Sequence, residues 1–179
     1  GNAAKVTGQT APTVLVQKCN TEVGYVYGGG NAADVPATYV TITGGTINDV
    51  YGGGHGDKAS LATQQDPDHS DKTANVTGNA YVLVNGGTIY RVFAASNTNG
   101  TITGTDSVIV NKNSSCDLHI TELYGGSNMA DGKAGVIAIK NTGNPANSEG
   151  IDYVYGGSNA ANVTNSIILN ILEGSISNV

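Results

Sequence analysis

The sequence Val-Tyr-Gly-Gly-Gly at residues 50–54 is one of five variants of a single phrase that recurs along the chain. The other variants are Val-Tyr-Gly-Gly-Gly at 26–30, Val-Phe-Ala-Ala-Ser at 92–96, Leu-Tyr-Gly-Gly-Ser at 123–127 and Val-Tyr-Gly-Gly-Ser at 154–158. Self-similarity at intervals of a few tens of residues is typical of stacked repeat architectures, in which each repeat buries its apolar face against its neighbours. The phrase therefore predicts a repeat fold that extends over the whole chain.

Strand-like segments lie between the phrases. Residues 76–84 read Val-Thr-Gly-Asn-Ala-Tyr-Val-Leu-Val, with a small or β-branched residue at every second position, which is the period of a strand that buries one face. Glycine pairs at 44–45 and 86–87 mark corners, because glycine adopts positive φ at little cost. Short strands of this kind recur at 14–16, 40–42, 82–84, 108–110, 137–139 and 167–169.

The fold class follows from this pattern. No segment has apolar residues at i, i+3 and i+4 over a dozen positions, so helices are disfavoured. We predict an all-β fold, a single-stranded parallel β-helix (β-solenoid) of about six rungs stacked roughly 4.8 Å apart. Right-handed winding is expected from the general rule for parallel crossovers. We expect one domain over residues 1–179, a fragment of a longer repeat protein because residues 176–179 align with 47–50 inside a repeat, and a polar loop inserted at 57–74.

Composition excludes two classes of partner. The chain has 26 glycines, no tryptophan, 12% charged residues and a formal net charge of -6. Arg91 is its one arginine, and the lysines are scattered, so nothing forms the basic surface that a nucleic acid requires. The longest apolar run, around 167–172, is far shorter than the ~20 residues of a membrane span.

Each phrase carries one aromatic residue. These residues are Tyr27, Tyr51, Phe93, Tyr124 and Tyr155. If the aliphatic residue before each ring points inward, the ring points outward, and stacked rungs place the rings in one file. An exposed file can accept the flat faces of sugars. The alternative is structural, since stacked rings stabilise a sheet through cross-strand pairs whether or not a ligand binds.

A second outward column precedes the rings by two residues. It consists of Tyr25, Asp49, Arg91, Glu122 and Tyr153. Arg91 falls between two carboxylates, so Asp49, Arg91 and Glu122 are expected to form an alternating ladder. Exposed ion pairs usually contribute under about 1 kcal/mol, which favours a structural role, although the charged column also borders the candidate glycan-binding face.

A third column follows the glycines. It consists of Asn31, His55, Asn97, Asn128 and Asn159. Asparagine tolerates the left-handed region and bonds neighbouring backbone or the next rung, so the column predicts an asparagine ladder at the corner.

Acidic and histidine residues gather around the inserted loop. His55, Asp57, Asp66, Asp68 and His69 are the candidate metal ligands, through oxygen for Ca²⁺ or through imidazole for a softer metal. Their spacing fits neither an EF-hand nor a calcium β-roll. We therefore expect a solvated loop and no cofactor, with Ca²⁺ as the alternative.

Catalysis has little support from the sequence. Asp49 and Glu122 are two rungs apart, about 10 Å, within the separation of a glycosidase pair. Arg91 lies between them and opposes the raised pKa that a general acid needs.

The two cysteines lie far apart in the predicted stack. Cys19 and Cys116 follow the short strands of the first and fourth rungs, roughly 14 Å apart, whereas a disulfide needs Cα atoms within about 7 Å. We therefore predict two free thiols, with a detour of the post-strand loops that brings the cysteines together as the alternative.

One longer phrase carries a family resemblance. Gly-Gly-Thr-Ile-x-x-Val-Tyr-Gly-Gly-Gly at 44–54 resembles the repeats of large adhesin-like surface proteins from gut bacteria. The resemblance implies a secreted or cell-surface β-solenoid without assigned catalysis, and it carries no functional residues with it. We expect an extracellular, adhesin-like module that binds glycans or a host surface through the aromatic file. The alternative is a carbohydrate-active β-helix enzyme of the polysaccharide lyase or glycosidase type, with its site under the loop at 57–74.

Overall fold

The computed structural model describes residues 13–61, 63 and 70–179. In this part of the chain the strands form one sheet of ten strands, and every pairing between them is parallel. The helical residues described are two single 3-10 turns, η1 (Ala59–Leu61) and η2 (Pro145–Asn147). The predicted all-β class and the parallel pairing are therefore confirmed.

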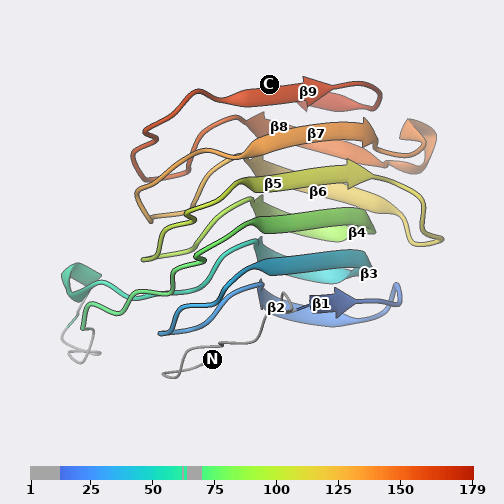
Figure 1. Cartoon of the computed structure of the whole chain (residues 1–179). Helices are drawn as coiled ribbons and strands as arrows, with labels where there is room; N and C mark the ends of the chain where they lie inside the picture. Colours follow the sequence, from blue (N-terminus) through green and yellow to red (C-terminus); the bar gives the residue numbers. More distant parts are fainter. Residues whose placement is uncertain (1–12, 62, 64–69) are drawn as a thin grey trace.

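The strands stack in two rows (Figure 1). Their bounds are β1 (Thr13–Val16), β2 (Glu22–Tyr27), β3 (Thr38–Tyr51), β4 (Ala80–Phe93), β5 (Asp106–Asn111), β6 (Leu118–Tyr124), β7 (Val136–Asn141), β8 (Gly150–Tyr155), β9 (Ile168–Ile171) and β10 (Ile176–Asn178). The first row runs through β1, the start of β3, the start of β4, β5, β7 and β9. The second row runs through β2, the end of β3, the end of β4, β6, β8 and β10.

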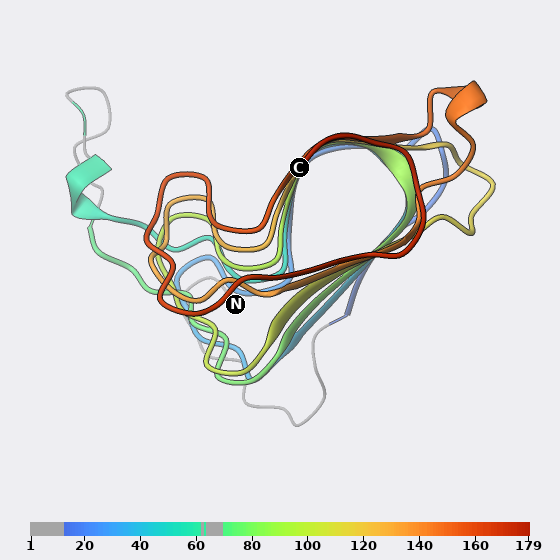
Figure 2. The ribbon, with the colours of Figure 1, turned by 90° about the horizontal axis from the view of Figure 1, so that it is seen from above.

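The two rows meet at a corner that the chain turns in two ways. In β3 and β4 the corner is made by glycine pairs, with Gly45 at φ +101° and Gly87 at φ +110°, values that a residue with a Cβ rarely adopts. After β1, β5 and β7 the chain instead makes loops, which project from the same corner in Figure 2 (blue, yellow and orange). Along the stack, two adjacent glycine corners in β3 and β4 therefore lie between the loop after β1 and the loops after β5 and β7.

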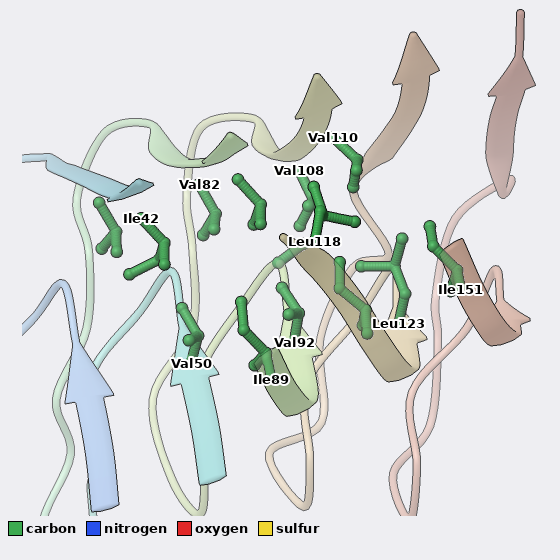
Figure 3. Close-up of a cluster of buried hydrophobic side chains, with 14 of the residues drawn as sticks. Ile42, Val50, Val82, Ile89, Val92, Val108, Val110, Leu118, Leu123 and Ile151 are labelled. Atoms are coloured by element: carbon green, nitrogen blue, oxygen red, sulfur yellow. The ribbon is translucent and has the colours of Figure 1, made fainter. Parts of the chain in front are cut away.

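The main core lies between the two rows. Alternate side chains of each strand point inward, so that Val40, Val82 and Val108 form one column and Val50 and Val92 face them from the second row. Figure 3 shows Val82 and Val108 of the first row and Val50 and Val92 of the second pointing toward one another. All five are fully buried, and each such aliphatic side chain contributes about 1.5–3 kcal/mol by leaving water. The sheet thus curls around its own core, an arrangement compatible with a β-solenoid.

A smaller core lies in the lobe that joins the end of the second row to the start of the first. It is built from Val35, Val76, Ala80, Ala95 and Ile102. Within the described residues, neither helical turn is long or apolar enough to cross a membrane.

The prediction of two free thiols is wrong. Cys19 and Cys116 form a disulfide, with their Cα atoms 5.2 Å apart and 97 positions apart in sequence. Cys19 lies in the loop after β1 and Cys116 in the loop after β5, and both loops project from the same corner (Figure 2).

The glycine corners of β3 and β4 make this contact possible. A Cβ at Gly44 would overlap Cys116 Sγ, and a Cβ at Gly86 would lie 2.8 Å from the carbonyl oxygen of Cys116. The two loops therefore bend toward each other across corners without side chains. The prediction counted strand spacings and treated each loop as flat in its own layer, and this assumption failed.

Candidate functional site

The aromatic residues of the five phrases lie in one file, as the repeat alignment predicted. Tyr27 pairs in register with Tyr51, Tyr51 with Phe93, Phe93 with Tyr124, and Tyr124 with Tyr155. Consecutive ring centroids are 4.8–4.9 Å apart, and the rings of Tyr51 and Phe93 are within 3° of parallel. The distance between rings equals the spacing between strands, because adjacent strands of the second row each carry one ring at the same register position.

The expectation of an exposed file is wrong for its three central rings. Tyr51 is 1% exposed, Phe93 0% and Tyr124 6%, whereas Tyr155 at one end is 41% exposed. The chain folds back after each Tyr-Gly-Gly corner (Figure 2), and the asparagine column lies across from the rings. Strand alternation showed correctly that the rings leave the main core, but it could not show that the next segment covers them.

Hydrogen bonds join the rings to the asparagine column. Asn97 Nδ2 donates to Tyr27 Oη at 3.0 Å, and Tyr124 Oη, which donates its one proton to Glu122, lies 3.4 Å from Asn159 Oδ1. The predicted ladder itself is present: Asn128 Nδ2 donates to Asn97 Oδ1 at 2.8 Å, and Asn159 Nδ2 donates to Asn128 Oδ1 at 2.9 Å. The side-chain amides of successive repeats thus hydrogen-bond to one another in a column that runs beside the aromatic file.

The column of Tyr25, Asp49, Arg91, Glu122 and Tyr153 is also in register. Arg91 donates from Nε to Asp49 Oδ1 at 2.8 Å and from Nη2 to Asp49 Oδ2 at 2.7 Å. The Asp49 side chain is 3% exposed, so this bidentate pair is largely removed from water. The bond to Asp49 raises the pKa of Arg91 above its usual value.

The carboxylates also accept from the tyrosines. Tyr51 Oη donates to Asp49 Oδ2 at 3.0 Å, and Tyr124 Oη donates to Glu122 Oε2 at 3.0 Å. Burial, and the carboxylate beside each hydroxyl, raise the pKa of Tyr51 and of Tyr124 well above the ordinary value.

This pairing explains why one ring of the file is phenylalanine. Asp49 precedes Tyr51 by two residues and Glu122 precedes Tyr124 by two, so each hydroxyl has an acceptor on its own strand. Arg91 precedes Phe93 by two, and a guanidinium has no acceptor. Its Cζ lies 5.6 Å from the centroid of the Phe93 ring, a cation–π contact that needs no hydroxyl.

The geometry gives Asp49 and Glu122 structural roles. Both Asp49 oxygens accept hydrogen bonds from Arg91, and Tyr51 adds a third bond. Glu122 accepts a hydrogen bond from the hydroxyl of Tyr124, whose ring is buried in the file. A general acid and base pair requires carboxyl groups with an oxygen directed at substrate, and Asp49 directs both of its oxygens at protein groups.

The two candidate metal ligands that the structure describes, His55 and Asp57, contact protein groups. His55 Nδ1 lies 2.9 Å from Asn31 Oδ1, and Asp57 Oδ1 accepts from the backbone N–H of Lys58 at 3.0 Å. Asp66, Asp68 and His69 lie outside the described residues. Within the part of the chain that the structure describes, no three His, Cys, Asp or Glu side chains are placed to hold a metal ion.

No protein family, curated protein or solved structure matches this chain.

Two further features were not predicted. Tyr39 and Tyr81 stack on the outer face of the first row, with centroids 4.6 Å apart. The signal was present in sequence, because both residues open the repeated segments at 39–47 and 81–89.

Asp106 is the second unpredicted feature. It is buried where β5 begins, and its Oδ2 has no hydrogen-bond partner among the described residues. Burial raises the pKa of Asp106 to about 6. Its partner in the next layer is a glycine, Gly135, where a Cβ would lie 2.9 Å from Asp106 Cγ.

Proposed function

We propose that this chain is an extracellular, non-catalytic module of a surface protein. It is a right-handed parallel β-solenoid of about six rungs, and it serves as a rigid, adhesin-like element that holds an adhesive surface for glycans. The aromatic file is part of its framework.

The observation that carries this proposal is the Cys19–Cys116 disulfide. Disulfides persist in oxidising environments and are rare in the reducing cytosol. A bridge between loops 97 positions apart also supports a rigid module, since in a stack each layer otherwise contacts only its neighbours.

The absence of catalysis is supported by the polar groups of the file. The Asp49 carboxylate, which the sequence pairs with Glu122 as a candidate for acid–base chemistry, is fully engaged by Arg91 and Tyr51. Enzymes usually place such a group in a cleft that substrate can reach, whereas both Asp49 oxygens bond to protein groups inside the stack.

Two measurements test the proposal. An antibody against the domain should label intact cells that produce the natural protein, and labelling only after permeabilisation would contradict an extracellular location. The purified domain should retain glycans on an array without releasing reducing ends or unsaturated products. Release of either product would show catalysis.

A further inference from the structure

The outer face of the first strand row has a composition of its own. Two columns of side chains point outward there. They are Thr13, Tyr39, Tyr81, Ser107, Val136 and Ile168 in one column, and Leu15, Thr41, Leu83, Ile109, Ala138 and Asn170 in the other. We call these residues the outer face. Among the described residues, no other segment crosses in front of it in Figure 1.

The outer face is uncharged. Neither column contains an acidic or basic residue, and Lys140, near the corner end of β7, borders it. The corresponding face of the second row differs, since it carries Glu22 and the pair of His119 with Asp152, at 3.2 Å. Charged residues are mostly found at exposed positions. Their absence from one face alone marks that face as a candidate interaction surface.

Two aromatic rings stand on this face. Tyr39 and Tyr81 are stacked, with an interplanar angle of 18°, and Tyr39 is 38% exposed. Their neighbours in the column are Thr13 on one side and Ser107 on the other. The outer face of each ring is therefore next to a short hydroxyl side chain, and the ring pair projects above its smaller neighbours on both sides.

The size of the face limits what it can hold. At about 4.8 Å per strand spacing and 3.3 Å per residue, the row from β1 to β9 presents roughly 24 Å by 13 Å, or about 300 Å² of flat sheet. A stable protein–protein interface needs about 800 Å² from each partner. The outer face is therefore too small for a stable complex with a second copy or with another protein, but it is large enough for a few sugar units.

We propose that the outer face binds a neutral polysaccharide, with the Tyr39–Tyr81 pair as its stacking platform. This deepens the adhesive function proposed above, on which it rests, by naming the ligand class and the residues. Ring faces offer large apolar area at low entropic cost to the C–H faces of a sugar. The hydroxyls of Thr13, Thr41 and Ser107 are placed beside the rings to exchange hydrogen bonds with sugar hydroxyls.

Charge decides between neutral and anionic glycans. An anionic polysaccharide is bound through arginine and lysine, and the outer face has neither within its two columns. The chain also has a formal net charge of -6, which repels a polyanion. A neutral chain has no such penalty.

Affinity electrophoresis of the whole domain tests the proposal. The probes are hydroxyethyl cellulose, mannan, galactan and soluble starch as neutral polysaccharides, with polygalacturonate as the anionic comparison. At least one neutral polymer should retard the domain. Tyr39→Ala and Tyr81→Ala should each weaken that retardation about tenfold, because each removes a ring face from the contact. Tyr81→Phe keeps the ring and should stay within a few-fold of the wild type.

Tyr90→Ala is the matched control. Tyr90 is 52% exposed on the second row, so its loss removes an exposed tyrosine without touching the outer face, and binding should be unchanged. Far-UV circular dichroism and an intact disulfide establish that each variant is folded.

Four results would overturn the assignment. Retardation that survives in both alanine variants would place the glycan elsewhere and leave the adhesive function standing. Retardation by polygalacturonate alone would reject the neutral class. Self-association in sedimentation velocity that Tyr39→Ala abolishes would show that a second copy occupies the face. No retardation by any polymer would remove both this site and the adhesive part of the proposed function, while surface labelling of intact cells would still test location.

Discussion

Truncation of Tyr51 tests whether the aromatic file is a structural element. Its ring is 1% exposed and lies between Tyr27 and Phe93, at centroid distances of 4.9 Å on each side. Its hydroxyl donates to Asp49, which also holds Arg91. Tyr51→Ala therefore removes two stacked contacts and a buried hydrogen bond and leaves a cavity in the middle of the file.

The expected cost is large. Replacement of a buried aromatic by alanine typically costs about 3–5 kcal/mol, and each stacked pair adds about 0.5–1.5 kcal/mol beyond area burial. The file also loses the bond to a charged acceptor, so we expect a decrease in the free energy of unfolding of about 4 kcal/mol or more. Tyr51→Phe keeps the ring and should lose about 1–2 kcal/mol.

Urea denaturation followed by far-UV circular dichroism measures both variants. Tyr90→Ala is the control, because Tyr90 is an exposed tyrosine one residue from the same ladder and should change the free energy of unfolding by less than about 1 kcal/mol. A Tyr51→Ala domain as stable as the Tyr90→Ala domain would refute the structural role of the file. Glycan binding that disappears in Tyr51→Ala at unchanged stability would instead support a binding role for the rings.

Three other perturbations have defined outcomes. Reduction of Cys19–Cys116 reopens a loop of 97 positions and should lower the free energy of unfolding by up to about 4.7 kcal/mol; hydrogen exchange should then increase in β1 and β2, and unchanged stability would count against the bridge as a clamp. Phe93→Tyr places a buried hydroxyl beside Arg91, which offers no acceptor, and should cost about 1–3 kcal/mol in urea denaturation; a neutral result would refute the pairing rule. Burial raises the pKa of Asp106 to about 6 from an ordinary value of 3.8, so the folded state binds its proton more tightly, and stability should fall by up to about 3 kcal/mol as pH rises from about 4 to 6. Asp106→Asn should flatten that slope, and an equal slope in both proteins would contradict the assignment.

The register of the stack could be predicted from sequence because the repeats align. Tyr27, Tyr51 and Tyr124 occupy equivalent places in their phrases, and parallel pairing of equivalent segments brings them into one file. The asparagine ladder follows from the same alignment.

Features that depend on the path of a loop could not be predicted from the sequence. The disulfide depends on how the loops at Cys19 and Cys116 bend over Gly44 and Gly86, and spacing along the strands does not describe that path. The burial of Tyr51 likewise depends on a segment that folds back after the glycines. A two-residue period indicates which side of a strand a residue occupies, but it does not indicate what covers that side.

The alkylation state of the two cysteines tests the proposed extracellular module most directly, because the disulfide carries that proposal. The oxidised domain is unfolded in guanidinium, treated with iodoacetamide without reductant, and weighed by mass spectrometry. Because the loops after β1 and β5 bend toward each other over Gly44 and Gly86 and bring Cys19 and Cys116 within bonding distance, we expect no carbamidomethyl groups, and two after reduction. Two groups on the unreduced protein would contradict the bridge and remove the observation on which the proposed extracellular module rests.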